Sequence, residues 1–376
     1  MGNGGNYVKA LNMNVAVVGT SKKENEKRVA IHPEQIKSIP ENIRRNLFFE
    51  KGYGMPFGVS DEEIATLTGN QLLDRKILFE NFKAIIIPKP VEEDFEEMQE
   101  GTRVWGWVHT VQQRNIAQIA MDKKLTLITW ENMYYQGSRS RTHIFQKNNE
   151  MAGYCGVQQA LQLKGIDGNF GAPRKVIVFS FGSVSRGAIN ALRGHGFSDV
   201  TVFTQRPTYL ISDKIPGIQY RQIHRIGAES FQVENISGEL IPIIEELINA
   251  DIIVNGVLQN PNAPVMWINE NDIIKFRKEC LVIDISCDKG MGFSFAHSSD
   301  SRQPLYKEGN ISYYCVDHTP TLLWEGASWE ISNCIVPLLQ DFVEENYNAV
   351  LNGAIDIREG VIINKDILTF QNRLQN

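Results

Sequence analysis

The stretch VIVFSFGSVSRGAINAL, from Val176 to Leu192, decides the fold of this chain. An apolar run rich in β-branched residues leads into glycine and small polar residues, and a series of helix formers follows. That order is typical of a strand, a tight turn and a helix whose first amides face a pyrophosphate. The stretch therefore predicts a dinucleotide-binding turn.

The turn departs from the usual G-x-G-x-x-G frame, because Ser180 and Ser185 stand in its first and third places. Gly182 keeps the middle place, where the backbone approaches the phosphates, and Gly187 is expected to let the helix pack on the strand. Serine is small and can donate to phosphate, so the motif is weakened but not lost. Similar turns occur in α/β proteins that bind no dinucleotide. The cofactor contacts expected here are Ser180, Gly182, Ser183, Val184 and Ser185.

The next predicted strand, in DVTVFTQRP, bears on the choice of cofactor. It ends in Thr204, Gln205 and Arg206, whereas NAD enzymes carry an acid there that binds the ribose hydroxyls. An acid would repel a 2'-phosphate, and Arg206 could pair with one. Thr204 and Arg206 are therefore candidate cofactor contacts, and the sequence favours NADPH, with NAD left open.

Length and composition limit the classes of function. The 376 residues exceed one ordinary core, so we expect two domains, and 42% hydrophobic and 22% charged residues indicate a globular protein. A net charge of -6 argues against nucleic acid or an anionic membrane as partner, which leaves small molecules. No apolar run approaches a membrane span and the N-terminus lacks a signal-peptide core, so a cytoplasmic location is expected.

The cysteines and histidines give no sign of a disulfide framework or a metal site. The five cysteines are odd in number and form no C-x-x-C pair, which predicts buried free thiols. The seven histidines are scattered without ligand spacing. We therefore expect no metal.

Strand-like and helix-like runs alternate along the whole chain. A first series contains NVAVVG, NLFFE, KAIIIP, RVWGWVH and LTLITW, and a second contains KVIVFSF, DVTVFTQ, DIIVNGV, CLVIDIS and ISYYCVD. The long helical candidate FQKNNEMAGYCGVQQALQLKG separates them, and residues 324–350 follow as one long helix or a broken pair. This alternation predicts an α/β fold with mostly parallel sheets.

Seven motifs, distributed in order over nearly the whole chain, carry a resemblance to a known family. They are KENEKRVAIHP, IIIPKPVEED, GWVHT, NEMAGYCGVQQAL, SFGSVSRGA, IDISCDKG and VDHTPTLLWEGAS. The chain resembles the alanine dehydrogenase and pyridine nucleotide transhydrogenase family, and within it the lysine-forming saccharopine dehydrogenases and carboxyethyl-ornithine synthase. The resemblance implies two Rossmann-like domains with parallel sheets. A cofactor domain, 151–324, would be inserted into a discontinuous substrate domain, 1–150 with 325–376.

The resemblance also implies roles for residues of the first series. Arg28 would hold the carboxylate of a 2-oxo acid, and Lys89 and His109 would serve as catalytic groups. Taken alone, Arg28 is typical of an exposed side chain in a charged segment, Lys89 of an edge charge, and His109 of a packed histidine. Glu131 would lie near the substrate.

Further residues follow from the same resemblance. Asp288 would lie beside the nicotinamide, and Asp317 and His318 near the ribose or nicotinamide, whereas Asp284 is expected to be structural. Arg139 and Arg141 stand roughly where saccharopine dehydrogenases keep arginines for a dicarboxylate, but the spacing differs. Pyruvate and 2-oxoglutarate therefore both stay open as the oxo acid.

The activity implied is a reductive condensation. The amino group of an amino acid attacks the carbonyl of a 2-oxo acid, water leaves, and the imine takes a hydride from NAD(P)H. The alternatives are an alanine dehydrogenase, which uses ammonia as the amine, and a nucleotide-binding module without catalysis. The amine, the physiological direction and assembly into a homo-oligomer stay open.

Overall fold

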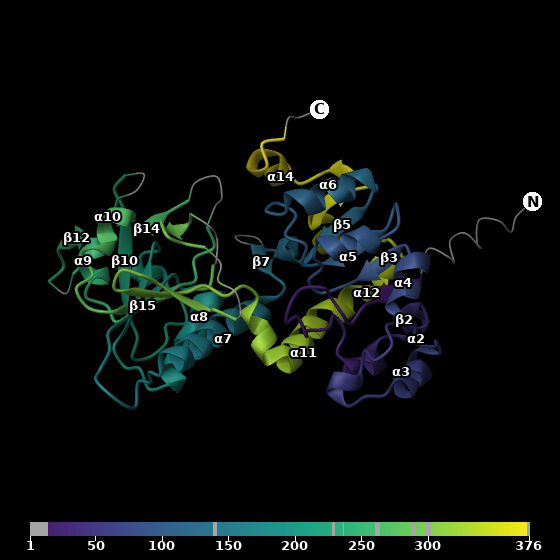
Figure 1. Ribbon diagram of the computed structural model, residues 1–376, viewed down its shortest axis with the longest axis horizontal. Coiled ribbons are helices and arrows are strands. Elements are labelled where there is room, and N and C mark those ends of the chain that lie inside the picture. Colours follow the sequence, from purple (N-terminus) through teal and green to yellow (C-terminus); the bar gives the residue numbers. More distant parts are fainter. Residues whose placement is uncertain are drawn as a thin grey trace, which may run out of the picture. The chain divides into compact units, whose positions relative to one another are not determined.

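The structure, a computed structural model, forms two compact units (Figure 1). It describes residues 14–137, 141–227, 230–235, 237–259, 264–286, 290–297, 299 and 302–373. Unit 1 combines Met1–Gln146 with Leu323–Asn376, and unit 2 is the continuous segment Lys147–Leu322.

Unit 1 is built on a seven-stranded sheet with the order β2-β1-β3-β4-β5-β19-β20. The first five strands are parallel, and β19 and β20 extend the sheet antiparallel. Their bounds are β1 Val15–Val17, β2 Leu47–Phe49, β3 Ala84–Ile86, β4 Arg103–Gly106, β5 Thr126–Thr129, β19 Ile355–Arg358 and β20 Val361–Ile362. The predicted α/β fold with mostly parallel sheets is thus confirmed for this unit.

Both faces of this sheet are covered, which explains why its strands are continuous apolar runs. Along β1, Val15 and Val17 belong to one core, whereas Ala16 and the following Val18 belong to the other. The helices of the unit are α2 Glu41–Arg44, α3 Asp61–Thr68, α4 Arg75–Asn81, α5 Glu92–Glu97, α6 Arg114–Asp122, α11 Trp324–Ile335, α12 Leu339–Val343, α13 Ala349–Gly353 and α14 Lys365–Phe370. A separate hairpin pairs β6 (Tyr134–Gln136) with β7 (Arg141–His143).

The region expected as one long helix or a broken pair is broken. α11 ends at Ile335, a 3-10 turn runs over Val336–Leu338, and α12 and α13 follow as short helices. Pro337 lies in the 3-10 turn, and proline lacks the amide that would continue an α-helix.

Unit 2 contains a nine-stranded sheet with the order β12-β11-β10-β9-β8-β13-β15-β18-β17. The six strands from β10 to β18 in that order are parallel. β11 pairs antiparallel with β10, β12 pairs antiparallel with β11, and β17 pairs antiparallel with β18. The bounds are β8 Val176–Phe179, β9 Val200–Thr204, β10 Gln219–Arg225, β11 Phe231–Glu234, β12 Leu240–Pro242, β13 Ile252–Asn255, β15 Cys280–Asp284, β17 Leu305–Glu308 and β18 Ile311–Tyr314. A small sheet pairs β14 (Met266–Ile268) with β16 (Gly292–Phe293).

Strand order reverses at β8, because β9 and β10 lie on one side of it and β13 and β15 on the other. In doubly wound folds, ligands bind outside the carboxyl ends of the strands at such a reversal. The helices of unit 2 are α7 Gln146–Lys164, α8 Ser183–Gly194, α9 Ile243–Leu247 and α10 Glu270–Ile273. The turn between β8 and α8 therefore starts at the position where a ligand is expected.

Two glycines let α7 and α8 cross at close range. A Cβ on Gly187 would lie 1.8 Å from the carbonyl oxygen of Glu150, and one on Gly153 would lie 1.8 Å from that of Val184. The sequence predicts that Gly187 packs the helix on its own strand. The atoms nearest to it belong instead to the neighbouring helix, which corrects that expectation.

Four of the five cysteines lie in the described residues. Cys155, Cys280 and Cys315 are buried and Cys334 is half-buried, all with free thiols, and Cys287 lies outside the described residues. In the described part of the chain, no helix is both long and apolar enough to cross a membrane.

Candidate active site

The carboxyl edge of the unit 1 sheet gathers four of the predicted site residues. Lys89 follows β3, His109 follows β4 and Glu131 follows β5, while Arg28 lies in the segment after β1. The carboxyl ends of parallel strands share one edge of a sheet, so the fold itself collects these side chains. Two of them, Arg28 and Lys89, are buried although they are charged.

Arg28 is buried, with 3% of its surface exposed, and is not the exposed arginine that its charged segment predicts when taken alone. Its Nε and Nη2 donate to the two carboxylate oxygens of Glu26 at 2.8 and 2.5 Å. The guanidinium lies over the ring of Trp107, 4.9 Å from its centroid. Burial, ion pair and ring contact together fix the orientation of the guanidinium. Glu26 was not predicted.

Lys89 and His109 are brought together by the close approach of two strands. A Cβ on Gly106 would lie 1.9 Å from the carbonyl oxygen of Ile87, so only glycine fits at the end of β4. The amide of Trp107 donates to the carbonyl of Pro88 at 2.8 Å. The segment that ends at His109 therefore runs directly beside the segment that ends at Lys89.

His109 adopts a left-handed backbone conformation, with φ of 54°, which is uncommon for a residue other than glycine. Its carbonyl accepts from the amides of Gln112 and Gln113, ahead of α6. Its own amide donates to the carboxylate of Glu131. Strained backbone of this kind is enriched at functional sites.

Glu131 is held next to this strained turn with its carboxyl group out of water. The pKa of the group is raised to about 8, mainly because it is removed from water and also because Asp356 lies near it. The amide of His109 and the charge of Lys89 act in the opposite direction. Within the described residues, Oε2 is buried and has no hydrogen-bond partner. At neutral pH the group is therefore mainly a neutral acid.

Asp356 was not predicted and comes from β19, the antiparallel neighbour of β5. It is 1% exposed, and Asn132 and Asn364 each donate to its Oδ1 at 2.9 Å. Burial raises the pKa of this carboxyl, and those hydrogen bonds oppose the rise. Two buried carboxylates close together would repel each other, so one of the two carboxyl groups keeps its proton.

The hairpin of β6 and β7 supplies the predicted Arg141. Arg141 is exposed and its guanidinium lies over the ring of Tyr134, 4.3 Å from the centroid. His143, which was not predicted, is on the same hairpin, and burial lowers its pKa. Arg139 lies outside the described residues.

In unit 2, the turn between β8 and α8 has the geometry expected of a phosphate-binding turn. Ser180 has φ of 73°, a conformation typical of the glycine that it replaces. Gly182 precedes α8, and among the described residues the only atom within 4 Å of a Cβ built on it is Oγ of Ser180, at 3.7 Å, so side-chain packing does not crowd this position. Ser183 and Val184 are the first residues of the helix, where amides lack partners within the helix.

Ser185 differs from its prediction. It is fully buried, and its hydroxyl donates to the carbonyl of Phe179 at 2.8 Å. A Cβ on Gly256 would lie 2.6 Å from that hydroxyl, so the serine fills the gap between the helix and β13. The hydroxyl is therefore engaged within the fold, which corrects the expectation that it donates to phosphate.

A cavity of about 360 Å³ opens at the carboxyl ends of β8, β9 and β10. Ser180, Thr204 and Arg206 line it, and so does Arg225, which was not predicted. Nη2 of Arg206 donates to the carbonyl of Phe181 at 3.4 Å. Among the described residues that line the cavity there is no acid, so both charged side chains are cations. The wall of the cavity therefore carries two guanidinium groups.

The remaining predicted residues of unit 2 lie after β15 and β18. Asp317 is half-exposed and His318 is nearly buried; Oδ2 and Nδ1 of the two lie 3.5 Å apart, and His318 has φ of 50°. Asp284 is fully buried and accepts from Asn255 at 3.0 Å, which agrees with a structural role. Asp288 lies outside the described residues. Within the described ranges, no group of three or more His, Cys, Asp and Glu residues is arranged to hold a metal.

Comparison with known families agrees with this geometry. Residues 17–152 match the family description "Alanine dehydrogenase/PNT, N-terminal domain", and residues 156–371 match "Alanine dehydrogenase/PNT, C-terminal domain". The chain belongs to the alanine dehydrogenase/PNT family. The resemblance read from the motifs is confirmed.

The relatives include enzymes of two kinds. An N(5)-(carboxyethyl)ornithine synthase from Clostridium botulinum is 25% identical, with 82% of this chain and 88% of that enzyme aligned. An alanine dehydrogenase from Bacillus subtilis is 24% identical, with 85% of this chain and 84% of that enzyme aligned. A solved L-alanine dehydrogenase superposes with a TM-score of 0.75 at 16% identity, over 96% of this chain and 100% of that one. The last match confirms the predicted fold class.

Proposed function

We propose that the chain is an NAD(P)H-dependent oxidoreductase that condenses a 2-oxo acid with the amino group of an amino acid. The observation that supports this best is the set of Arg28, Lys89, His109 and Glu131 at one edge of the unit 1 sheet. A module that only binds nucleotide needs no guanidinium, ammonium, imidazole and carboxylic acid in one place. In this proposal unit 1 binds the substrates and unit 2 binds the cofactor.

Loss of the ammonium proton is the first problem of the reaction. An alkyl ammonium with a pKa near 10.4 must become a free amine, at a cost of about 4.6 kcal/mol at pH 7. Lys89 or His109 is the base that takes this proton, and the same group returns it to the carbonyl oxygen as water leaves. Glu131 lies beside both and keeps its own proton at neutral pH, so it holds a proton in reserve for this exchange.

Arg28 binds the carboxylate of the oxo acid in this proposal. A guanidinium fork binds a carboxylate with two parallel hydrogen bonds, which fixes the carbonyl for attack. Glu26 already occupies one edge of the fork through Nε and Nη2. The substrate carboxylate therefore binds the other edge or displaces Glu26, so Glu26 sets how tightly the oxo acid binds.

The reduced pyridine nucleotide supplies the hydride that converts the imine into an amine. Backbone amides at Gly182, Ser183 and Val184 would hold its pyrophosphate, and Ser180 shapes the turn. Thr204 and Arg206 would bind the adenosine ribose, and Arg225 adds a second guanidinium at the end of the neighbouring strand. Two cations, with no acid among the described residues that line the cavity, favour NADPH over NADH. Asp288, Asp317 and His318 stay predicted contacts of the nicotinamide half.

The amine separates the proposal from its nearest alternative. The carboxyethylornithine synthase relative supports an amino acid as the amine, and the alanine dehydrogenase relative supports ammonia. The VDHTPTLLWEGAS segment favours condensation with an amino acid, as in the saccharopine dehydrogenases that it resembles. Arg141, with Arg139, is the proposed contact for a second carboxylate if the oxo acid is 2-oxoglutarate.

The experiment is a screen of nucleotide oxidation by the purified full-length protein. NADPH or NADH is supplied with pyruvate or 2-oxoglutarate and with ammonia, ornithine or lysine, and loss of the reduced nicotinamide absorbance is followed. We expect turnover with an amino acid as amine, faster with NADPH than with NADH. Turnover with ammonia alone would make the protein an alanine dehydrogenase, and nucleotide binding without turnover would favour the binding module.

Replacing His109 tests the proton-transfer step directly. We predict that His109→Ala lowers turnover at least about a hundredfold, because a general acid-base group contributes that much or more, while nucleotide affinity is unchanged. Gln112→Ala, an exposed change in the same loop, is the matched control. A His109→Ala protein with the wild-type rate would remove His109 from the mechanism.

The place of action and the assembly belong to the same proposal. Free thiols at Cys155, Cys280, Cys315 and Cys334 support a reducing compartment, and we propose the cytoplasm. A homo-oligomer stays a prediction that size-exclusion chromatography with light scattering tests.

A further inference from the structure

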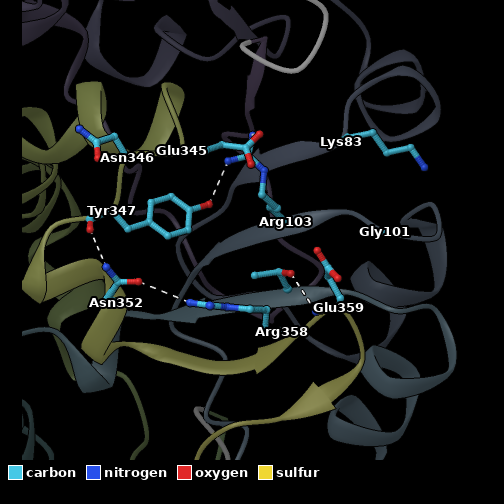
Figure 2. Close-up of a pocket in the computed structure, with 10 residues that line it drawn as sticks. Lys83, Gly101, Arg103, Glu345, Asn346, Tyr347, Asn352, Arg358 and Glu359 are labelled. Atoms are coloured by element: carbon cyan, nitrogen blue, oxygen red, sulfur yellow. Dashed lines mark hydrogen bonds and ion pairs between the residues drawn. The ribbon is translucent and has the colours of Figure 1, made fainter. Parts of the chain in front are cut away.

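A second cavity lies at the amino edge of the unit 1 sheet (Figure 2). This edge is opposite the carboxyl edge that carries Lys89, His109 and Glu131. Its volume is about 610 Å³. Lys83 directly precedes β3, Arg103 opens β4 and Thr126 opens β5, so this wall consists of the amino ends of the same strands that carry the candidate active site. The other wall comes from the C-terminal segment between residues 345 and 359.

Arg103 is the most firmly held cation of this cavity. Its side chain is 12% exposed, and its Nη2 lies 3.1 Å from a carboxylate oxygen of Glu345. Its Nη1 donates to the carbonyl of Phe342 at 3.2 Å and to the hydroxyl of Tyr347 at 3.0 Å. Figure 2 shows Tyr347 and Glu345 converging on this guanidinium. Its orientation is therefore fixed in advance of any ligand.

Arg358 lies at the end of β19 and is exposed. Its Nη2 donates to the side-chain oxygen of Asn352 at 3.4 Å, which turns the guanidinium along the cavity wall (Figure 2). Burial raises the pKa of the Tyr347 phenol, and the charges of Arg103 and Arg358 both oppose that rise. The field of both guanidiniums therefore reaches Tyr347.

The two carboxylates of the cavity come from strained backbone positions. Glu345 has φ of 56° and Glu359 has φ of 48°, in the left-handed region that costs a residue with a Cβ roughly 1 kcal/mol or more. Glu359 opens the turn between β19 and β20, where glycine or asparagine is favoured. Backbone strain of this kind suggests a function for the side chain, because strained positions are retained mainly where the side chain is needed.

Charge balance then selects the ligand. Lys83, Arg103 and Arg358 give three positive charges, and Glu345 and Glu359 give two negative ones, so the lining is positive by one. A phosphate or nucleotide would meet both carboxylates, and a diamine would meet three cations. A ligand with two carboxylates and one ammonium balances the net charge and meets groups of both signs.

We propose that this cavity binds an acidic α-amino acid. Arg358 and Lys83 take its carboxylates, the charge of Arg103 adds to their attraction, and Glu345 and Glu359 take its ammonium. The cavity lies away from Lys89, His109 and Glu131, so the inference is independent of the proposed reaction. It adds a second small-molecule site to the substrate unit.

The test is calorimetric titration of the full-length protein, without cofactor, with L-glutamate as the probe. We expect Arg358→Gln and Glu359→Gln each to weaken binding about tenfold, as for loss of one charge-assisted contact. Both residues are exposed, so the variants should keep the fold. Lys365→Gln, an exposed change at the start of α14 and outside the cavity, is the control and should bind as the wild type does.

Three results would overturn the proposal. The first is the absence of L-glutamate binding. The second is binding that survives Arg358→Gln and Glu359→Gln but is lost in Arg28→Gln, because L-glutamate would then occupy the candidate active site. The third is equal affinity for glutarate, which has both carboxylates and no ammonium, because the two glutamates would then have no ligand group to bind.

Discussion

Ser180 and Ser185 replace glycines of the same motif, yet their surroundings make them different residues. Ser180 has φ of 73°, where glycine pays no steric cost, whereas Ser185 lies in α8 with its hydroxyl bonded to Phe179. Ser180→Gly should therefore leave stability unchanged or raise it by up to about 1 kcal/mol, since relief of strain competes with unfolded-chain entropy. Ser185→Gly should cost about 1–2 kcal/mol through the lost hydrogen bond and the helix glycine. Urea unfolding of the two variants measures both; the reverse order would contradict this account.

The buried acid Glu131 should make stability depend on pH. Its pKa is about 8 in the folded chain and near 4.5 when unfolded, so between these values the folded state keeps a proton that the unfolded state releases. Stability therefore falls as pH rises through that interval, by up to about 1.4 kcal/mol per pH unit. Glu131→Gln mimics the neutral acid and should remove most of this pH dependence. Urea unfolding from about pH 5 to about pH 8, the interval between the unfolded and folded pKa values, measures the change.

A control variant shows whether the change in pH dependence is specific to Glu131 or follows from any Glu→Gln substitution. Glu96→Gln alters an exposed carboxylate of α5 and should leave the slope as it is in the wild type. Asp356 has a raised pKa as well, so a small slope should persist in Glu131→Gln. An unchanged slope in Glu131→Gln would mean that the carboxyl group ionises normally in the folded chain.

The sequence alone located site residues that directly follow a strand. It missed site residues whose position depends on the pairing of strands that are far apart in the sequence. Lys89, His109 and Glu131 each follow an apolar run, so their common edge could be predicted from a parallel sheet. Asp356 could not, because its approach to Glu131 requires β19 to pair with β5 across more than two hundred residues. The motif named Arg28 but gave no sign that Glu26, two residues earlier, binds it.

At the scale of elements, the crossing of α7 and α8 should be the part of unit 2 least tolerant of added volume. A Cβ on Gly187 would meet backbone atoms of Glu150 at 1.8 Å, and backbone cannot move aside as a flexible side chain can. Gly187→Ala should therefore cost about 3 kcal/mol or more. Gly194→Ala, in the same helix with open space around it, should be neutral or stabilise by up to about 1 kcal/mol. Equal urea midpoints for the two variants would show that α7 and α8 are not packed this closely.

In the large sheet of unit 2, the strands that the sequence missed are short or have few buried residues. β10 reads QYRQIHR, with one fully buried residue, and β11 and β12 are short antiparallel strands at the edge of the sheet. The buried central strands β8, β9, β13, β15 and β18 were all predicted, because strands covered on both faces are continuous apolar runs. Arg225 was missed for this reason, since it ends a strand that the pattern did not show.

At the scale of the whole molecule, each unit has hydrophobic clusters of its own. Two clusters lie in unit 1 and two in unit 2, and the chain leaves unit 1 once and returns to it. Separate cores allow separate unfolding transitions, so a ligand that binds one unit should stabilise that unit alone. The tryptophans offer a way to tell the units apart, because Trp267 alone belongs to unit 2 and the other five belong to unit 1.

We therefore predict that NADPH separates the thermal unfolding transitions of the two units. At about a hundredfold excess over its dissociation constant, NADPH should raise the free energy of unfolding of unit 2 by roughly 2.7 kcal/mol. The part of the circular dichroism signal that unit 2 contributes should then change at a higher temperature. Tryptophan fluorescence, which reports mainly unit 1, should melt at the same temperature with and without nucleotide. A fluorescence midpoint that rises together with the circular dichroism midpoint would mean that the two cores unfold as one. A rise in fluorescence alone would mean that the nucleotide binds unit 1, against the assignment of the serine-bearing turn as its site.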